Sequence, residues 1–241
     1  MTKNTLIIIP ARLASRRLNR KMLADINGEP LILKTYRSAV AAGAADVIVA
    51  CDGEEIASII RAAGGTAIIT DPDLPSGTDR ICAAYEEYCK SHEECDSIVN
   101  LQGDLPFIGV EFIEAVIDGL YSCNYDIHTL ATPITDNSYT ENHVVKPVIA
   151  FSSTHSGRAI YFSRSVVPIG GPYYHHVGIY SSKPNALRKL VSLAPSSLEL
   201  SEKLEQLRAL ENGMTIGITV VHQAKPISVD VQEDLLRARR Y

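Results

Sequence analysis

The chain has 241 residues, with 23 Lys and Arg against 28 Asp and Glu, a formal net charge of −5, and 46% hydrophobic residues. This composition is typical of a soluble globular protein and excludes the disordered and fibrous classes. The mild acidic excess argues against a general nucleic-acid binder. Five cysteines, an odd number without a Cys-x-x-Cys pair, indicate a reducing compartment and no zinc–thiolate cluster.

The apolar segments are too short to be a membrane-spanning helix or a signal peptide. No stretch approaches the ~20 apolar residues that a membrane-spanning helix needs. The run Leu6–Ile9 is too short for a signal-peptide core and is followed at once by Pro10 and Arg12. We therefore expect a cytoplasmic protein that has no membrane partner.

The first half of the chain alternates between short β-branched runs and helical segments. Strands are predicted at Leu6–Ile9, Val47–Ala50, Ala67–Thr70 and Ser97–Leu101, and helices at Leu31–Ala42, Glu54–Ala63, Thr78–Lys90 and Glu111–Tyr121. Buried strands joined by helices predict an α/β fold with a mostly parallel sheet and helices on both faces. In such sheets ligands bind beyond the carboxyl ends of the strands.

The pattern changes from about residue 129 and favours a smaller, more antiparallel subregion. Strands are predicted at His128–Pro133, Val144–Phe151, Ala159–Ser163, Val177–Tyr180 and Ile216–His222, and helices at Asn185–Val191, Ser197–Glu211 and Glu233–Arg240. No flexible linker precedes this part, so we expect a subregion of one domain.

A basic segment follows the first predicted strand. Five cations fall within the ten residues from Arg12 to Lys21. A solvated basic loop is the simpler interpretation of such a run, but its place after the first strand of a parallel sheet favours a polyphosphate site. The glycine spacing and the Gly-Lys-Ser/Thr ending of a Walker A loop are absent, so the prediction is phosphate binding without a P-loop.

Two further strand ends carry candidate residues. Ser76–Arg80 precedes a helix, where it either binds a ligand through free N–H groups or caps the helix. Asp104 follows the fourth strand and is either a Mg²⁺ ligand or a turn residue. Asp230 offers a second acid, although the N-cap of the last helix is the simpler interpretation of it alone.

The second half carries polar residues whose pattern alone favours structural roles. His176, Gly178 and Tyr180 share one face of a predicted strand. The adjacent pair His175 and His176 is a weak metal signal because no third ligand is suitably spaced. The polar residues of Leu204–Arg208 lie on an amphipathic helix, where the pattern predicts a solvated face.

Taken in chain order, these segments resemble the cytidylyltransferase family that activates 3-deoxy-manno-octulosonate (Kdo) as its CMP sugar. The resemblance covers essentially the whole chain. It is carried by Pro10–Lys21, Asp25–Pro30, Ser76–Arg80, Gln102–Pro106, Tyr161–Arg164, His176–Tyr180, Leu204–Arg208 and Val229–Asp230. Each motif is weak alone, but eight in register are specific.

The resemblance implies a role for each matching residue. The nucleotide would be bound by Arg12, Ser15, Arg17, Lys21, Ser76, Gly77, Thr78, Arg80 and Gln102. Asp104 and Asp230 would hold Mg²⁺, and with Arg12 and Lys21 they would form the catalytic set. The sugar acid would be bound by Arg164, His176, Tyr180, Glu205 and Gln206. The helix predicted to be solvated is thus reinterpreted, from the resemblance alone, as a wall of the substrate site.

The resemblance also implies the reaction and the organisation of the chain. CMP would pass from CTP to the anomeric hydroxyl of Kdo, which gives CMP-Kdo and pyrophosphate for lipopolysaccharide or capsule synthesis. Residues 1–128 and 212–241 would form the nucleotide-binding core, and residues 129–211 the sugar-binding and dimerisation subregion of a homodimer. A nucleotide-diphospho-sugar transferase type of fold is expected.

Departures from the family pattern keep the substrate open. Asn19 and Arg20 replace the usual Pro-Gly before Lys21, Leu105 replaces a Glu or Gln, and Val231-Gln232 replaces Thr-Pro. One alternative is the same reaction on a related acid, such as 8-amino-3,8-dideoxy-manno-octulosonate. The other is a non-catalytic nucleotide-binding homologue.

Overall fold

The structure is a computed structural model that describes residues 4–15, 18–43, 46–122 and 124–241. The chain forms two compact units, one of residues 1–113 and 226–241 and the other of residues 114–225. These bounds differ from the expected division, which placed residues 114–128 and 212–225 with the nucleotide-binding core. The functional division stays a prediction. In the described parts of the chain, no helix combines the length and the apolar character needed to cross a membrane.

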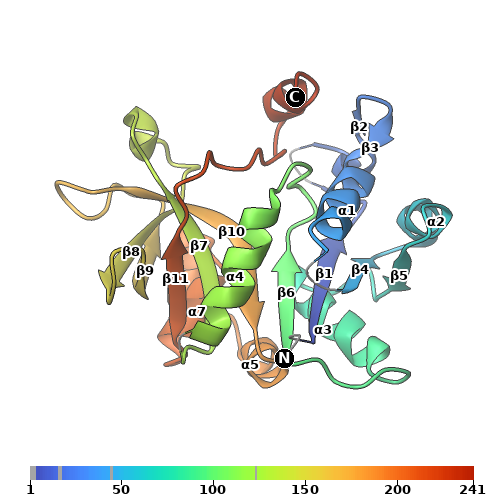
Figure 1. Cartoon of the computed structure of the whole chain (residues 1–241), viewed down its shortest axis with the longest axis horizontal. Helices are drawn as coiled ribbons and strands as arrows, with labels where there is room; N and C mark the ends of the chain where they lie inside the picture. Colours follow the sequence, from blue (N-terminus) through green and yellow to red (C-terminus); the bar gives the residue numbers. More distant parts are fainter. Residues whose placement is uncertain (1–3, 16–17, 44–45, 123) are drawn as a thin grey trace. The chain divides into compact units, whose positions relative to one another are not determined.

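The first unit is built on a parallel sheet in the order β5-β4-β1-β6 (Figure 1). Its strands are β1 (Thr5–Ala11), β4 (Asp46–Cys51), β5 (Thr66–Ile69) and β6 (Ser97–Leu101), and its helices are α1 (Leu31–Ala41), α2 (Glu54–Ala62), α3 (Gly77–Tyr88) and α8 (Gln232–Ala238). A short 3-10 helix η1 (Lys21–Leu23) and the hairpin β2 (Asp25–Ile26) and β3 (Glu29–Pro30) follow β1.

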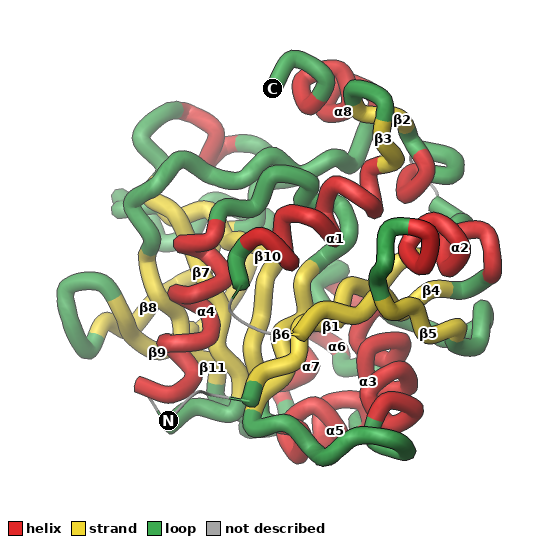
Figure 2. The backbone as a smooth tube through the Cα atoms, turned by 45° about the vertical axis from the view of Figure 1, so that its right-hand side comes forward, coloured by secondary structure: helices red, strands yellow, loops and turns green. Residues whose placement is uncertain are grey.

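Burial explains why the strands of the first unit are so apolar. All seven residues of β1 are buried, as expected for a central strand that is covered on both faces. Figure 2 shows α1 and α2 on one side of β1, β4 and β5, and α3 on the other. The predicted α/β class, with a mostly parallel sheet and helices on both faces, is confirmed.

The second unit contains a mixed sheet in the order β10-β7-β11-β9-β8. Its elements are β7 (Ile127–Pro133), η2 (Asn137–Thr140), β8 (Lys146–Phe151), β9 (Ser156–Ser163), β10 (Tyr174–Ser182), α5 (Pro184–Ser192), α6 (Ser197–Glu202), α7 (Gln206–Glu211) and β11 (Ile216–Val220), and α4 (Val110–Ser122) carries the chain into it. Only the β7–β11 pair is parallel among these neighbours, so the expected antiparallel character is present.

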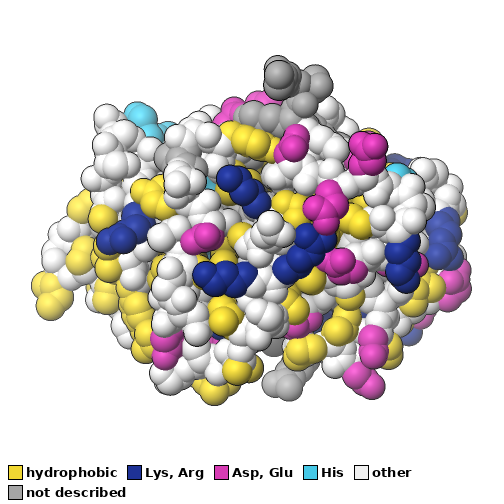
Figure 3. Space-filling model, turned by 90° about the horizontal axis from the view of Figure 1, so that it is seen from below, with side chains coloured by type: hydrophobic (Ala, Val, Ile, Leu, Met, Phe, Trp, Pro, Cys, Tyr) yellow, Lys and Arg dark blue, Asp and Glu magenta, His cyan; other side chains and the backbone are white. Residues whose placement is uncertain are grey.

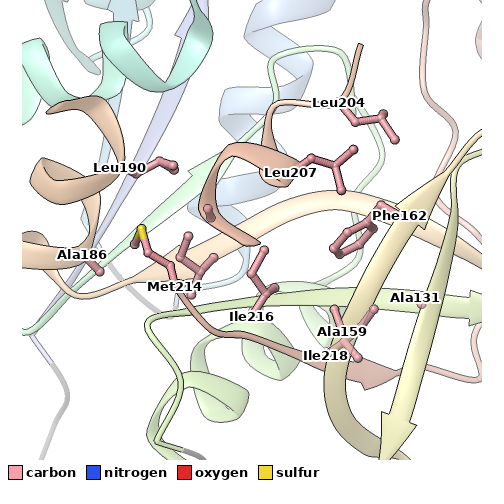
Figure 4. Packing of buried hydrophobic residues seen from close by; sticks show 12 residues of the cluster. Ala131, Ala159, Phe162, Ala186, Leu190, Leu204, Leu207, Met214, Ile216 and Ile218 are labelled. Atoms are coloured by element: carbon pink, nitrogen blue, oxygen red, sulfur yellow. The ribbon is translucent and has the colours of Figure 1, made fainter. Parts of the chain in front are cut away.

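The core of the second unit lies between this sheet and the helices after β10. Figure 4 shows Leu190 of α5, Leu207 of α7 and Phe162 of β9 in one buried cluster with Met214 and Ile216. Leu207, Phe162 and Ile216 are fully buried, and together they remove a large apolar area from water. This packing fixes α7 against β9, a contact that matters for the residues discussed below.

The single helix predicted over Ser197–Glu211 is wrong. The segment forms two helices, α6 and α7, because Lys203 adopts the left-handed conformation at φ 56° and ends the first of them. Left-handed backbone is uncommon outside glycine, so periodicity, which continues through Leu204, did not reveal the break.

The face drawn in Figure 3 has Lys and Arg side chains interspersed with Asp and Glu. This mixture of positive and negative side chains agrees with the small net charge of −5, which is a sum over local groups of opposite charge.

Two buried histidines and one half-buried histidine in the second unit predict acid sensitivity. Burial lowers the pKa of His128 to about 4 and the pKa values of His175 and His176 to about 3, so the folded chain keeps them neutral. Below the ordinary histidine pKa of about 6.5, the unfolded chain takes up protons that the folded chain does not. The free energy of unfolding therefore falls as pH decreases from about 6.5 to 4, by up to about 1.4 kcal/mol per pH unit for each histidine.

Urea unfolding followed by circular dichroism at pH 7, 6 and 5 measures this slope. His128 packs between Gly119 and Gly217, and among the described residues only its Nε2 is hydrogen-bonded, to Thr219 Oγ1 at 2.9 Å. His128→Gln should make the slope shallower by about one histidine's share. The exposed His222 provides the control, and His222→Gln should leave the slope unchanged. Equal slopes in all three proteins would contradict the prediction.

Candidate active site

A cavity of about 470 Å³ opens at the carboxyl ends of the first unit's strands. Loops after β1, β5 and β6 and the segment before α8 contribute to its wall. The predicted residues that line it are Arg12, Ser15, Lys21, Ser76, Gly77, Arg80, Gln102, Asp104 and Asp230. Thr78 is buried within α3, and Arg17 lies outside the described residues. The topology thus brings together four sequence segments at the sheet edge where α/β proteins bind ligands.

The centre of this cavity is an ammonium group between two carboxylates. Lys21 Nζ lies 2.7 Å from Asp104 Oδ2 and 3.1 Å from Asp230 Oδ1. The Lys21 side chain is 10% exposed. Burial by itself would lower the pKa of Lys21, but the two carboxylates outweigh it and raise the pKa above its ordinary value. The Lys21 ammonium group therefore keeps its positive charge at neutral pH, in contact with the two carboxyl groups.

Backbone hydrogen bonds hold the two segments that carry these carboxylates. The N–H of Val229 donates to the carbonyl oxygen of Asp104 at 2.9 Å, which ties the segment before α8 to the loop after β6. The carboxylate of Asp234 accepts from the N–H groups of Asp230 and Val231 at 3.0 and 3.2 Å. The simpler interpretation of Asp230 as the N-cap of the last helix is therefore wrong: Val231 occupies that position, and the Asp230 carboxylate faces Lys21.

The described residues meet the chemical requirement for a magnesium site with a nucleotide. Mg²⁺ in nucleotide enzymes is commonly held by one or two carboxylates together with substrate phosphates and water. Asp104 and Asp230 supply two hard oxygen ligands that already converge on one cation. Within the described residues no cluster of three or more His, Cys, Asp or Glu side chains forms a metal site. The pair fits Mg²⁺ that is bound jointly with a ligand.

The loop after β1 is held by an acid that the sequence did not single out. Asp52, which follows the second strand, accepts from the N–H of Leu13 at 3.1 and 2.9 Å with its two oxygens. The Arg12 side chain is exposed beside it. The position of Asp52 directly after a buried strand could have indicated this residue from sequence, because acids at such sheet edges either bind ligands or fix neighbouring loops.

The segment before α3 serves as a helix cap and as cavity wall. Ser76 is the N-cap, and its hydroxyl oxygen accepts from the N–H of Asp79 at 3.2 Å. The capping alternative for Ser76 is therefore confirmed, and its place in the cavity wall leaves the ligand role open. Arg80 is 3% exposed and donates to the hydroxyl of Thr70.

Gly103 is required by a close backbone approach. A Cβ at this position would lie 2.9 Å from the carbonyl oxygen of Pro10 and 3.0 Å from Met22 Sδ. Any larger residue would push the loop after β6 away from β1. Gln102 in the same loop donates to Asn100 Oδ1 at 2.8 Å, which orients its amide at the cavity.

The second unit brings together the residues expected for a sugar acid in two groups. His176 and Tyr180 are neighbours with ring centroids 5.4 Å apart, and Thr129 Oγ1 contacts His176 Nε2 at 3.0 Å. The strand is irregular between Val177 and Tyr180, where the Thr129 hydroxyl donates to the carbonyl of Ile179 at 2.7 Å. Burial raises the pKa of Tyr180, so the phenol stays protonated.

The second group lies around the end of β9 and the break between α6 and α7. Arg164 follows β9, Glu205 is the N-cap residue of α7, and Gln206 is its first residue. Gln206 is 8% exposed and Arg208 is 6% exposed, so the solvated face predicted from periodicity is wrong here. Arg208 is buried because Glu199 accepts from its Nε and Nη2 at 2.8 and 2.6 Å.

Comparison with known proteins shows full-length similarity to one family. The cytidylyltransferase family model matches residues 6–216. The chain is 46% identical to the 3-deoxy-manno-octulosonate cytidylyltransferases of Parvibaculum lavamentivorans, covering 97% of this chain and 91% of the relative, and of Paramagnetospirillum magneticum, covering 97% and 96%. A solved CMP:2-keto-3-deoxy-manno-octonic acid synthetase complexed with CTP is 35% identical, with a TM-score of 0.88 over 99% of this chain and 98% of that chain.

Proposed function

Because this chain belongs to the cytidylyltransferase family, we propose that it transfers CMP from CTP to the anomeric hydroxyl of Kdo and releases pyrophosphate. The observation that carries the proposal is the Lys21 ammonium held between Asp104 and Asp230 in the cavity of the first unit. A cation beside paired acids is suited to a nucleoside triphosphate and its magnesium ion.

The nucleotide is assigned to the cavity of the first unit. Arg12, Ser15 and Lys21 would bind the triphosphate. Arg17, which lies outside the described residues, is expected to assist them. The base and the nearby phosphate are assigned to Ser76, Gly77, Thr78, Arg80 and Gln102. Guanidinium, ammonium and backbone N–H groups are the usual partners of phosphate oxygens, which supports this assignment.

The magnesium ion is assigned to Asp104 and Asp230. When bound, it would neutralise negative charge on the phosphate oxygens of CTP. Lys21 already contacts both acids, so it would lie beside the same phosphates and contribute a second positive charge. The fit of two convergent carboxylates to this ion supports the assignment.

The sugar acid is assigned to the second unit, where Arg164 would bind its carboxylate. His176, Tyr180, Glu205 and Gln206 would contact its hydroxyl groups. The neutral His176 and Tyr180 suit this task, because each can hydrogen-bond a hydroxyl group without a charge that would compete with Arg164.

The reaction requires no covalent intermediate with the protein. The anomeric oxygen forms a bond to the α-phosphorus of CTP, the hydroxyl proton passes to solvent, and the bond from the α-phosphorus to the pyrophosphate oxygen breaks. The reaction needs two anionic substrates to be held together and the charge on the phosphate oxygens to be balanced. Arg12 and Lys21 would provide that balance, and Arg164 would hold the acceptor.

Pyrophosphate release from a substrate panel tests the proposal. The purified chain is incubated with Mg²⁺, each of four nucleoside triphosphates, and Kdo, its 8-amino-3,8-dideoxy analogue or a sialic acid. We expect turnover with CTP and Kdo and none without a divalent ion. Turnover with CTP and the amino analogue alone would move the substrate to the related acid. CTP binding without turnover on any acid would indicate a non-catalytic homologue.

The assembly and the pathway complete the proposal. From the family assignment we expect a homodimer formed through strands of the second unit. We also expect the product, CMP-Kdo, to supply lipopolysaccharide or capsule synthesis. Light scattering measures the assembly, and a monomeric mass at working concentration would contradict it.

A further inference from the structure

The guanidinium of Arg164 lies in a cradle of main-chain carbonyl groups. Its Nε donates to the carbonyl oxygen of Glu202 at 3.1 Å, and its Nη1 to the carbonyls of Asn142 and His143 at 3.3 and 3.4 Å. Among the described residues, Nη2 has no hydrogen-bond partner. Two nitrogens of the fork are thus fixed by neutral acceptors, while the third remains available to a ligand.

The carboxylate of Glu202 binds the end of β9 instead of the guanidinium. Its Oε1 accepts from the Ser163 hydroxyl at 2.7 Å and from the Tyr161 hydroxyl at 3.4 Å, and its Oε2 accepts from the Arg164 N–H at 3.1 Å. The hydrogen bonds of this carboxylate therefore fix the backbone from which Arg164 projects. The guanidinium retains its charge for an anion of the substrate.

A buried lysine supports the same residue from its other side. Lys146 in β8 is 0% exposed, and its Nζ donates to the carbonyl oxygens of Arg164 and, at 3.1 Å, of Glu141. Glu141 directly precedes the two residues whose carbonyls accept from the guanidinium. Burial, with the nearby Arg164 charge, lowers the pKa of Lys146. Arg164 is therefore held through its N–H, its carbonyl and its side chain.

Glu202 also lies at the break between the two helices. It is the last residue of α6, and the left-handed Lys203 directs the chain from it to Glu205 and Gln206. The carboxylate thus joins the end of β9 to the segment that carries two other residues assigned to the sugar acid. The Glu202 side chain therefore fixes the spacing between Arg164 and the segment that carries Glu205 and Gln206.

We propose that Glu202 is a positioning residue that fixes Arg164 so that its Nη2 edge faces the carboxylate of the acidic substrate, with Lys146 as the second support. This inference rests on the proposed function, which assigns Arg164 to the sugar acid. Glu202 acts through Arg164 and does not itself contact the reacting atoms. Its loss should therefore affect the binding of the acid and leave the nucleotide almost unaffected.

Steady-state kinetics of Glu202→Ala and Glu202→Gln test this role. We expect the alanine variant to raise the KM for the sugar acid about 10- to 100-fold, because misplacement of an anchoring group by about 1 Å has effects of this size. The KM for CTP should stay within about twofold of the wild type. Glu202→Gln should recover most of the loss, because its amide oxygen can accept from the Arg164 N–H while its amide nitrogen donates to the Ser163 hydroxyl.

Glu211 offers a chemically matched control. Its carboxylate accepts from the Ser197 hydroxyl at 2.5 Å and from the Leu198 N–H at 2.9 Å, so, like the Glu202 carboxylate, it binds a hydroxyl group and a main-chain N–H. Glu211→Ala removes contacts with the first turn of α6, at the opposite end of that helix from Glu202, and should leave the KM for the sugar acid unchanged. An equal KM increase in both alanine variants, or no increase in Glu202→Ala, would overturn the proposal.

Calorimetric titration of the sugar acid into each variant provides a readout independent of turnover. We expect weaker binding in Glu202→Ala by the same factor as the KM, with binding restored in Glu202→Gln. The wild type separates the two ideas: if it neither binds nor turns over any sugar acid, the proposed function fails. If the wild type binds the acid and Glu202→Ala binds it equally well, only the positioning role fails.

Discussion

Asp104→Asn should reduce CTP-dependent pyrophosphate release by about 100-fold or more, the size of effect seen when a group that stabilises transition-state charge is removed. Asparagine has nearly the same shape as aspartate. The main-chain carbonyl of residue 104, which accepts from the Val229 N–H, is unchanged, so the fold around the site should persist. What it removes is one of the two negative charges that contact Lys21 and are assigned to the magnesium ion. The ion would then be held by Asp230 and the substrate alone.

A magnesium titration of pyrophosphate release separates this effect from misfolding. If the Asp104 charge holds the ion, the variant should need more Mg²⁺ for half-maximal rate, and calorimetry should show weaker Mn²⁺ binding in the presence of CTP. Asp96 is the matched control, since it precedes β6 while Asp104 follows it, and it accepts from the Asn4 N–H at the opposite end of the strand. Asp96→Asn should keep the wild-type rate. Near-normal turnover of Asp104→Asn would remove Asp104 from the metal site.

The edge at which these acids lie could be predicted from sequence because parallel strands have a strong local signature. The run Leu6–Ile9 is apolar at every position, and the strand it predicts, β1, is buried throughout. Residues that follow such strands must meet at one edge, whatever their separation in the chain. Arg12, Ser76 and Asp104 were therefore expected near one another, and they line one cavity.

The pairing inside the cavity could not be predicted in the same way. Lys21 is 83 residues from Asp104 and 209 from Asp230 in the chain, and no periodicity encodes so distant an ion pair. The sequence pattern favoured a capping role for Asp230, because an acid before a helix is common. The side chain is directed elsewhere because Asp234 takes the available N–H groups.

The second unit was harder to predict because its details depend on single backbone conformations. Lys203 divides a periodic segment into two helices without a glycine or proline to mark the break. Burial of Arg208 depends on an ion pair with Glu199, nine residues away and across that break. Amphipathic periodicity predicts which face is apolar, but it does not show that a polar residue is buried with a partner.

Lys21→Met is expected to have two opposite effects, one on the nucleotide and one on divalent metal. The variant removes the ammonium group that is assigned to the triphosphate, so kcat/KM for CTP should fall about 100-fold or more. The same change leaves Asp104 and Asp230 without the cation that now contacts both of them. Since a divalent ion could then take that place, Mn²⁺ should bind the nucleotide-free variant more tightly than the nucleotide-free wild type.

Calorimetric Mn²⁺ titration without nucleotide, together with pyrophosphate release, measures both effects on the same preparations. Arg20→Met is the matched control, because Arg20 is the preceding cation of the same loop, is about half exposed and pairs with Glu55 instead of the site acids. That variant should keep the wild-type KM for CTP and the wild-type Mn²⁺ affinity. A wild-type KM for CTP in Lys21→Met would exclude Lys21 from triphosphate binding. Unchanged Mn²⁺ affinity would show that the ammonium group does not compete with the metal for the two acids. In the free enzyme Lys21 would then neutralise Asp104 and Asp230 without controlling the access of the metal ion to them.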